Sequence, residues 1–278
     1  MLKKGVVFIV VAIILMCANA FAVSTYGGYN LPIDIDINGS FIKCAQKPIM
    51  IDSTTYIPLR AFSDAIGGEV SWDEEEMTAT MTKDGHSFSF YIQKNYCLVD
   101  GEIKNYTSVI YKDLTFIPVR AVSEVLGYEV LWDDFYLTVK ITAHGVEIPE
   151  NCKDKTYTYE DIIYLAKITH IESGNDYFEV KLGVAGTVVN RVKSPLAPNT
   201  VKDVIFDTRY GVQFPPAHTD KINVTPSKDS MIAAKCAISG VNIVGNSLYF
   251  IDTKSAPSSW LHNNKKHYIT VYDMSFYE

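Results

Sequence analysis

The chain opens with an almost unbroken apolar run, Gly5 to Met16, placed directly behind Lys3 and Lys4. Two small-x-small sites follow, at residues 18–20 and 20–22. Positive charge, apolar core and cleavage site, in that order, predict a secretory signal peptide over residues 1–22. The alternative is an uncleaved membrane anchor, because residues 5–22 approach the shortest length, roughly 17 residues, that spans a bilayer.

Behind this leader, one pattern of apolar and polar residues occurs twice. TYIPLRAFSDAIGGEVSWD (55–73) and TFIPVRAVSEVLGYEVLWD (115–133) are identical at 11 of 19 positions without a gap. Self-similarity of this kind indicates a duplicated structural unit.

Each copy predicts the same succession of elements. A strand ends at Ile-Pro, and proline suits the first turn of the helix that we expect over 60–66 and 120–126. Gly67 and Gly127 predict the helix ends. Strand-forming segments follow at 69–72 and 77–82, and in the second copy at 129–132 and 136–141.

After residue 157 the apolar residues take a helical spacing. Thr158 and Asp161 form a capping-box start, followed by a wide apolar stripe: Ile162, Ile163, Leu165, Ala166, Ile168 and Ile171. The segment 173–175, Ser-Gly-Asn, breaks this helix. A second helix is predicted over 178–192, where small residues permit close packing against another helix: Gly183, Ala185 and Gly186.

The sequence therefore predicts an α+β protein in two parts. A duplicated β-α-β module occupies residues 23–142, and a mainly helical domain with a small β portion occupies 158–278. The polar, proline-bearing segment 143–157 is typical of a linker. A length of 278 residues, 47% of them hydrophobic, is sufficient for two folded cores.

Charge separates the two parts. Residues 23–155 carry 11 Lys and Arg against 20 Asp and Glu, whereas residues 156–278 carry 12 of each. Neither part has a basic patch, which argues against a nucleic-acid partner. The cysteines at 44, 97, 152 and 236 form no C-x-x-C pair. A Cys44–Cys97 disulfide is open to an extracellular protein, but scattered cysteines are more often plain buried residues.

One residue, Glu172, stands out for its chemistry. It follows the apolar stripe and faces the helix-breaking turn, so apolar neighbours should raise its pKa. A glutamic acid that stays protonated suits general acid catalysis of glycosidic cleavage. By pattern alone, a solvated glutamate at a helix end is the commoner reading.

The repeat resembles the copper amine oxidase N-terminal-like domain, whose "IPLRA…G..V.WD" signature occurs twice over roughly 34–142. The single histidine of that region, His86, leaves no copper-ligand set. Trp72 and Trp132 are open to two roles, a sugar-stacking platform or plugs of the two repeat cores, and we favour the cores. The resemblance implies a binding or spacer module that contacts wall polymers.

Residues 158–278 resemble the cell wall hydrolases of the spore-cortex-lytic, SleB/CwlJ type. IESGNDYFE (171–179) and VAGTVVNRV (184–192) match that family's "…AEARGE.YEG…A.VVLNRV" without a gap, and later blocks fit at 190–206, 213–214, 247–250 and 260. The Ala-Arg of the family motif is replaced here by Ser173-Gly174. The resemblance implies a lysozyme-like fold and peptidoglycan glycan strands as the substrate.

By this resemblance Glu172 is the catalytic acid, and five residues contact the substrate: Glu179, Gln213, Phe214, Tyr249 and Trp260. We expect a secreted lytic transglycosylase of the cell wall or spore cortex that needs no metal or cofactor. Two alternatives stay open, a muramidase that hydrolyses the same bond and a non-catalytic wall-binding or spore-coat protein. For Glu179 the alternative is that it merely begins the second helix. For the other four residues, Gln213, Phe214, Tyr249 and Trp260, the alternative is packing in the core or in a loop.

Other chemistries find little support. His170-x-Glu172 lacks the P-C-x-x-C of a zinc deaminase. His218, His262 and His267 have no metal-site spacing.

Overall fold

The computed structural model describes residues 22–92, 94–256 and 259–278. The expected signal peptide, apart from Ala22, lies outside these residues. Within them, no helix has the length and apolar character needed to cross a membrane.

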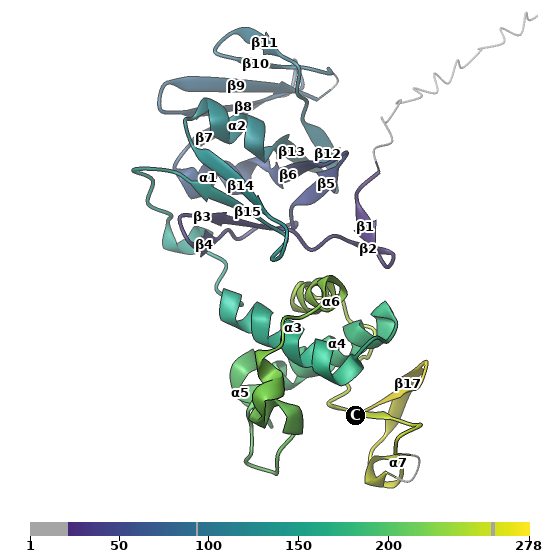
Figure 1. Ribbon diagram of the computed structural model, residues 1–278. Helices are drawn as coiled ribbons and strands as arrows, with labels where there is room; N and C mark the ends of the chain where they lie inside the picture. Colours follow the sequence, from purple (N-terminus) through teal and green to yellow (C-terminus); the bar gives the residue numbers. More distant parts are fainter. Residues whose placement is uncertain (1–21, 93, 257–258) are drawn as a thin grey trace, which may run out of the picture.

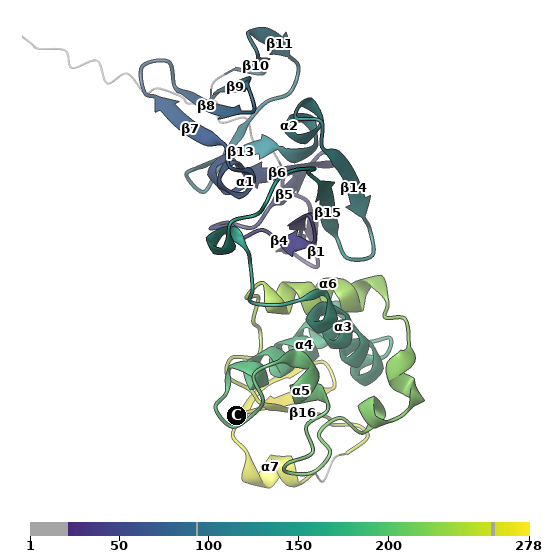
Figure 2. The same ribbon diagram turned by 90° about the vertical axis from the view of Figure 1, so that its left-hand side faces the viewer.

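The chain forms a mixed α+β structure in two parts (Figures 1 and 2). The upper part, here called the N-terminal module (residues 25–142), is built from short strands with two short helices. The lower part, the C-terminal domain (residues 159–277), is mainly helical with a small sheet at its far end. The expected α+β class is confirmed.

The two copies of the sequence repeat adopt the same order of elements. The first runs β6 (Thr54–Pro58), α1 (Leu59–Ile66), β7 (Glu69–Asp73) and β8 (Thr78–Lys83), and the second β13 (Leu114–Pro118), α2 (Val119–Val125), β14 (Glu129–Asp133) and β15 (Thr138–Thr142). Gly67 and Gly127 follow the helices with φ of 71° and 75°, a conformation that favours glycine. The expected helix ends are confirmed.

Among the described residues, the module consists of three larger sheets and the two-stranded sheet β1-β2. β6 and β13 pair antiparallel at the centre of a four-stranded sheet, in the order β12-β13-β6-β5. A five-stranded sheet has the order β11-β10-β9-β8-β7, and a second four-stranded sheet β14-β15-β3-β4. The remaining strands are β1 (Thr25–Tyr26), β2 (Tyr29–Asn30), β3 (Asp34–Ile37), β4 (Ser40–Phe41), β5 (Ile49–Ile51), β9 (His86–Tyr91), β10 (Cys97–Val99), β11 (Glu102–Lys104) and β12 (Val109–Tyr111).

The two tryptophans of the repeat take different positions. Trp72 is 49% exposed, so the expectation that it plugs a core is wrong. It lies on β7, whose other residues are also mostly exposed, so this strand has little to pack against. Trp132 is partly buried and packs against apolar residues of both parts of the chain. All four described cysteines are free thiols, including Cys44 and Cys97.

Helices dominate the C-terminal domain. α3 (Tyr159–Ser173), α4 (Phe178–Lys193) and α6 (Lys228–Ile238) pack around one core, as the expected helices require. Around them lie α5 (Val201–Ile205), α7 (Trp260–Asn264), the 3₁₀ turns η2 (Pro215–His218) and η3 (Asp220–Asn223), and an antiparallel sheet of β16 (Tyr249–Asp252), β18 (Met274–Tyr277) and β17 (His267–Val271). Gly183 admits the ring of Phe276 from β18, so this small residue serves a strand and not the expected helix.

Strand β3 joins the two parts, because its two faces serve different surroundings. The isoleucines at 33, 35 and 37 are buried in the module, while Asp34 and Asp36 point the opposite way. The Asp34 carboxylate accepts hydrogen bonds from Tyr157 (2.6 Å) and Lys47 (3.1 Å) and pairs with Lys235 of α6 at 2.9 Å. Tyr159 donates to Asp36 at 2.7 Å.

Lys235 is fully enclosed at this junction. Its ammonium also donates to the carbonyl oxygens of Tyr136 and Leu137 in the module, the latter at 3.0 Å. Burial alone would raise the pKa of Asp34, but the ammonium groups of Lys235 and Lys47 outweigh it and hold that pKa below its usual value. Burial lowers the pKa of Lys235, against the opposing effect of Asp34. Each charge therefore depends on the other.

The segment 143–157 is fastened to the module and is not a free tether. It contains the 3₁₀ turn η1 (Glu150–Cys152), and the backbone N–H of Asp154 donates to the carbonyl of Phe41 at 2.8 Å. Its last residue, Tyr157, is buried against Asp34. The polar composition that suggested a linker thus coexists with specific packing.

We expect Lys235→Met to lower the free energy of unfolding by about 3 kcal/mol, because it leaves the buried Asp34 carboxylate short of a partner. Urea unfolding followed by circular dichroism would measure the loss. Lys254→Met is the matched control, since Lys254 and its partner Asp273 are both exposed, and it should leave the midpoint unchanged. The double variant Asp34→Leu/Lys235→Met should recover much of the stability. A loss below about 1 kcal/mol for Lys235→Met would contradict this account of the junction.

Candidate active site

Helix α3 positions Glu172. The Thr158 side chain accepts from the N–H of Asp161 (3.1 Å), and the Asp161 carboxylate accepts from the N–H of Thr158 (2.9 Å), so the expected capping box is confirmed. Buried apolar residues then hold the helix along its length: Ile162, Leu165, Ala166 and Ile168. Glu172 lies in the last turn, and the helix ends at Gly174, whose N–H donates to the carbonyl of His170 at 3.0 Å.

The Glu172 carboxyl group is half-buried and poorly satisfied. Its Oε1 is buried and has no hydrogen-bond partner among the described residues. Burial raises the pKa of Glu172, and the nearby ammonium of Lys221, from η3, partly opposes this. The expectation of a raised pKa is confirmed. A carboxyl group in this state retains its proton to higher pH than an exposed glutamate and can deliver it to a bound group.

Glu179 occupies the first turn of α4, seven residues further along. A carboxylate there interacts favourably with the partial positive charge of the helix N-terminus. No side chain caps this helix, so the charge of Glu179 has a structural use. This placement favours the alternative in which Glu179 begins the second helix.

Three of the other expected residues meet in one pocket. Gln213, Tyr249 and Trp260 line a cavity of about 510 Å³ between α5, α7 and β16, together with Arg191 and Lys265. Lys265 lies over the Tyr249 ring, 4.3 Å from its centroid. We call this cavity the distal pocket. It combines aromatic faces, an amide, two cations and the carboxylate of Asp207.

The distal pocket lies apart from Glu172, which is not among its lining residues. α4 connects the two places, because its first residue adjoins the Glu172 turn and Arg191 is near its last. A rise of 1.5 Å per residue separates Phe178 from Arg191 by about 20 Å along the helix axis. The residues expected around one cleft thus occupy two regions.

Phe214 does not line the pocket surface. It is 1% exposed and packs against Phe250, with the Arg191 guanidinium 5.0 Å above its ring. The expectation that it contacts a substrate is wrong, because apolar packing encloses it completely. Its neighbour Gln213 remains accessible.

The pattern of the sequence did not point to three residues of these regions, Lys221, Arg191 and Lys265. Arg191 lies within the Asn-Arg-Val motif, which was the available signal for it. Lys221 and Lys265 lie in irregular segments, where no periodicity indicates which side chains face inward.

Three histidines of the C-terminal domain have separate structural partners. His262 bonds with the Tyr277 hydroxyl (2.5 Å), His267 with Thr270 (2.8 Å), and His218 packs on Phe206. Within the described ranges, no cluster of three or more His, Cys, Asp or Glu is arranged to hold a metal ion.

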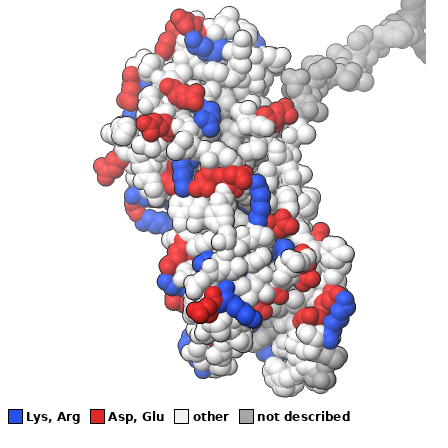
Figure 3. Space-filling view, viewed as in Figure 1, with Lys and Arg blue, Asp and Glu red and all other residues white. Residues whose placement is uncertain are grey.

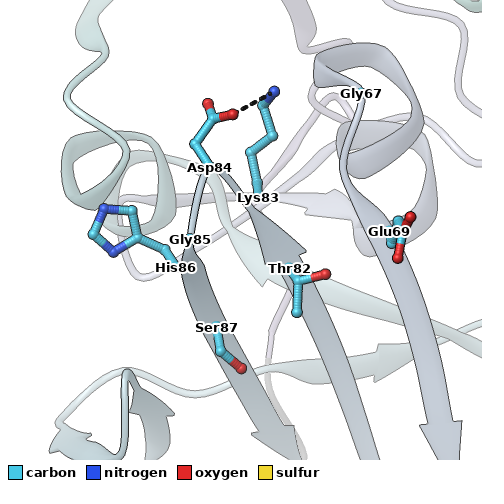
Figure 4. Close-up of a pocket in the computed structure, with 8 residues that line it drawn as sticks. All are labelled: Gly67, Glu69, Thr82, Lys83, Asp84, Gly85, His86 and Ser87. Carbon is cyan, nitrogen blue, oxygen red and sulfur yellow. Dashed lines mark ion pairs between the residues drawn. The ribbon is translucent and has the colours of Figure 1, made fainter.

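A second hollow, of about 340 Å³, lies on the module and is shown in Figure 4. It sits between the end of α1 and the β8–β9 turn. The Lys83–Asp84 ion pair, 3.0 Å long, lies above it, and the His86 ring points outward from the same turn. The His86 ring therefore does not point into the hollow, and it pairs with the carboxylate of Asp100 at 2.7 Å. The hollow is open and on the other part of the chain from Glu172, and we assign it no role.

Replacing Glu172 should stabilise the protein at neutral pH. Because its pKa is higher in the folded than in the unfolded chain, ionisation opposes folding; the penalty is absent below the ordinary glutamate pKa of about 4.3 and complete above the raised value. We expect Glu172→Gln to raise the melting temperature by about 2–4 °C at pH 7, equivalent to ~1 kcal/mol, and to give no gain near pH 4. Differential scanning calorimetry across that range would measure it.

Glu179→Gln is the matched control, since it removes a carboxylate of the same kind from a helix start. Glu179→Gln should lower the free energy of unfolding by about 0.5 kcal/mol at pH 7, where Glu172→Gln should raise it. Equal behaviour of the two variants would show that burial of Glu172 carries no penalty.

Comparison with known proteins places both parts of the chain. The Copper amine oxidase N-terminal domain family matches residues 36–141 and, in a second match, 105–182. The Cell Wall Hydrolase family matches residues 175–277. The matches overlap at 175–182, and Glu172 lies three residues before the hydrolase match begins.

Similar proteins include spore cortex-lytic enzymes. That of Bacillus cereus is 33% identical over 117 residues, 42% of each chain, and that of Oceanobacillus iheyensis is 31% identical over 42% of this chain and 40% of its own. The chain thus spans about two fifths of the length of these relatives. Among solved structures, the catalytic domain of the germination-specific lytic transglycosylase SleB from Bacillus anthracis is 28% identical, with a TM-score of 0.41, covering 45% of this chain and 99% of that domain. The chain therefore belongs to the Copper amine oxidase N-terminal domain family and carries a Cell Wall Hydrolase domain behind it.

Proposed function

We propose that this protein cleaves the glycosidic bond between N-acetylmuramic acid and N-acetylglucosamine in peptidoglycan, with Glu172 as the catalytic acid. The observation that carries the proposal is the state of that carboxyl group. It is half-buried, its Oε1 has no partner in the part of the chain that the structure describes, and burial raises its pKa. The Cell Wall Hydrolase match and the similarity to spore cortex-lytic enzymes support the substrate class.

In the first step, protonated Glu172 donates its proton to the glycosidic oxygen as the bond from the anomeric carbon breaks. The departing sugar leaves as a neutral alcohol, and positive charge develops at the anomeric carbon. Glu172 becomes a carboxylate in a partly desolvated position. The positive charge of the Lys221 ammonium, which partly offsets the rise of the Glu172 pKa caused by burial, stabilises that anion.

In the second step, we propose a lytic transglycosylase route. The 6-hydroxyl of the muramic acid attacks the anomeric carbon while the Glu172 carboxylate removes its proton, which closes a 1,6-anhydro ring and restores the acid. The route consumes no water and needs one carboxylate only. It suits a site in which Glu179 is committed to the start of α4.

The alternative is a muramidase, which cleaves the same glycosidic bond by hydrolysis. Water would replace the 6-hydroxyl, and a second carboxylate would be needed at roughly 5–9.5 Å from the first. Glu179 is the candidate for that role. A non-catalytic wall or spore-coat protein is the other alternative, and the retained, unpaired Glu172 argues against it.

We propose that the distal pocket holds a more remote part of the glycan strand. Exposed Trp260 and partly buried Tyr249 offer aromatic faces to sugar rings, and the Gln213 amide can pair with an N-acetyl group. Arg191 and Lys265 suit the carboxylates of the lactyl groups or stem peptides. Distance from Glu172 would make the pocket a determinant of binding and not of the chemical step.

We further propose a protein exported by its leader (1–22), with a duplicated module (23–142), a linker (143–157) and a lysozyme-like catalytic domain (158–278). The module would contact wall polymers, and the half-exposed Trp72 offers it a stacking surface. Acidic side chains spread over its visible face, with lysines and arginines among them (Figure 3). The site of action would be the cell wall or the spore cortex.

Mass spectrometry of muropeptides released from purified sacculi and spore cortex tests the reaction. We expect anhydro-muropeptides from the natural protein and a loss of about a thousandfold with Glu172→Gln, because general acid catalysis is removed. Glu179→Gln should keep activity within about tenfold, and EDTA should have no effect. Reducing-end muramic acid, with both variants inactive, would establish the muramidase instead.

Substitution of Trp260 tests the distal pocket. At 61% exposure the side chain contributes little to the core, so Trp260→Ala should leave the melting temperature unchanged. We expect KM for long glycan strands to rise about tenfold with kcat unchanged, the signature of lost uniform binding. Steady-state kinetics on soluble, uncrosslinked strands would show it, with Ile103→Ala, at a 65% exposed apolar side chain of β11 that has no proposed role, as the control that leaves KM on such strands unaltered. A fall in kcat for Trp260→Ala would place the pocket in the chemical step.

A further inference from the structure

The turn that follows Glu172 is held by a buried lysine. Lys181, in the second turn of α4, is 3% exposed, and its ammonium donates to the carbonyl oxygen of Gly174 at 2.6 Å. The same ammonium lies 3.5 Å from the Ser173 hydroxyl, which in turn donates to the carbonyl of Thr169 at 2.6 Å. Lys181 thus satisfies a carbonyl at the end of the helix that carries Glu172.

A buried ammonium needs compensating charge, and here it comes from one carboxylate outside the turn and one within it. Burial lowers the pKa of Lys181, and the carboxylates of Asp229 and Asp176 counteract it. Asp176 belongs to the turn itself, whereas Asp229 is in the first turn of α6. The negative charge of Asp229 favours the protonated form of Lys181 across space, and the two groups form no ion pair within 4.0 Å among the described residues. The direct contact between this region and the turn is the packing of Tyr26 on Phe178.

The N-terminal module orients this carboxylate. The hydroxyl of Tyr26, on β1, donates to the Asp229 carboxylate, and that bond raises the pKa of Tyr26 to about 12. The hairpin β1–β2 (residues 25–30) is paired through Thr25–Asn30 and Tyr26–Tyr29. It lies at the lower right of the module in Figure 1, on the side that faces α6.

The same hairpin encloses the first residue after the turn. The Phe178 ring packs edge-on against Tyr26, with centroids 5.2 Å apart, and lies 6.3 Å from Tyr29. Gly27 approaches so closely that a Cβ atom there would lie 2.4 Å from the Phe178 ring. The segment 173–178 is therefore held on one side by Lys181 of the same domain and on the other side by the hairpin of the module.

We propose that Lys181 is a positioning residue for Glu172 and that hairpin 25–30 is part of the catalytic unit, coupled to the turn through Tyr26 and Asp229. The inference rests on the proposed function of Glu172 and extends it to the module. In consequence the module contributes to the rate of cleavage itself, in addition to any contact with the wall. Tyr26 and Lys181 touch no substrate and act through the orientation of the turn.

Tyr26→Phe in the full chain is the sharpest test, because it removes one hydroxyl and keeps the ring on Phe178. We expect kcat on soluble glycan strands to fall about tenfold with KM unchanged, since a tilted acid affects the transition state only. Lys181→Met should lower kcat about a hundredfold. Tyr29→Phe is the matched control, on the same hairpin and beside the same ring but without the bond to Asp229, and it should keep the natural kcat.

Hydrogen exchange of the backbone amides of residues 174–178 provides a readout that requires no substrate. We expect Tyr26→Phe and Lys181→Met to accelerate exchange there about tenfold, and Tyr29→Phe to leave it unchanged. If the natural protein released no muropeptides but the exchange changed as expected, the function would fail and the coupling would stand. Unchanged exchange and kcat in folded Tyr26→Phe would overturn the inference, and melting temperatures identify any variant that fails to fold.

Discussion

The Asp34–Lys235 ion pair is the contact on which the arrangement of the two parts depends. Two opposite charges, each almost completely withdrawn from water, are tolerated only because they meet one another and several further donors and acceptors. Asp34 comes from strand β3 of the module and Lys235 from helix α6. Lys47 of the module also pairs with Asp34, whereas the enclosed ammonium of Lys235 pairs with Asp34 across the interface. Separating the two parts would therefore deprive the Lys235 ammonium of this carboxylate.

That orientation brings the N-terminal hairpin to the helix that begins beside Glu172. Lys235 and Asp229 occupy the same helix, α6, and Asp229 accepts the hydrogen bond from Tyr26. The buried ion pair and the hairpin contact are therefore parts of one interface. On a flexible linker, the module would be a passive spacer. Because segment 143–157 packs against it, the module is held next to the proposed active site.

The proposed site illustrates a compromise between stability and chemistry. A half-buried carboxyl group without a partner for Oε1 destabilises the fold at neutral pH, yet this state is what proton donation requires. Three features offset this loss of stability: α3 is capped and well packed, a glycine ends it, and the buried Lys181 donates to the carbonyl of Gly174. The pocket that we propose for a remote part of the substrate lies elsewhere, near the other end of α4.

Local pattern in the sequence determined the helices α3 and α4, the capping box at Thr158, the ends of α1 and α2 at Gly67 and Gly127, and the position of Glu172 in a last helical turn. These features depend on residues close in the chain. Tertiary structure alone decided that Trp72 is exposed, that Phe214 is enclosed, and that Gln213, Tyr249 and Trp260 gather in a pocket that Glu172 does not line. It also decided the pairing of Asp34 with Lys235, 201 residues apart. Burial and charge pairing depend on which distant segments meet, and periodicity along a chain carries no such information.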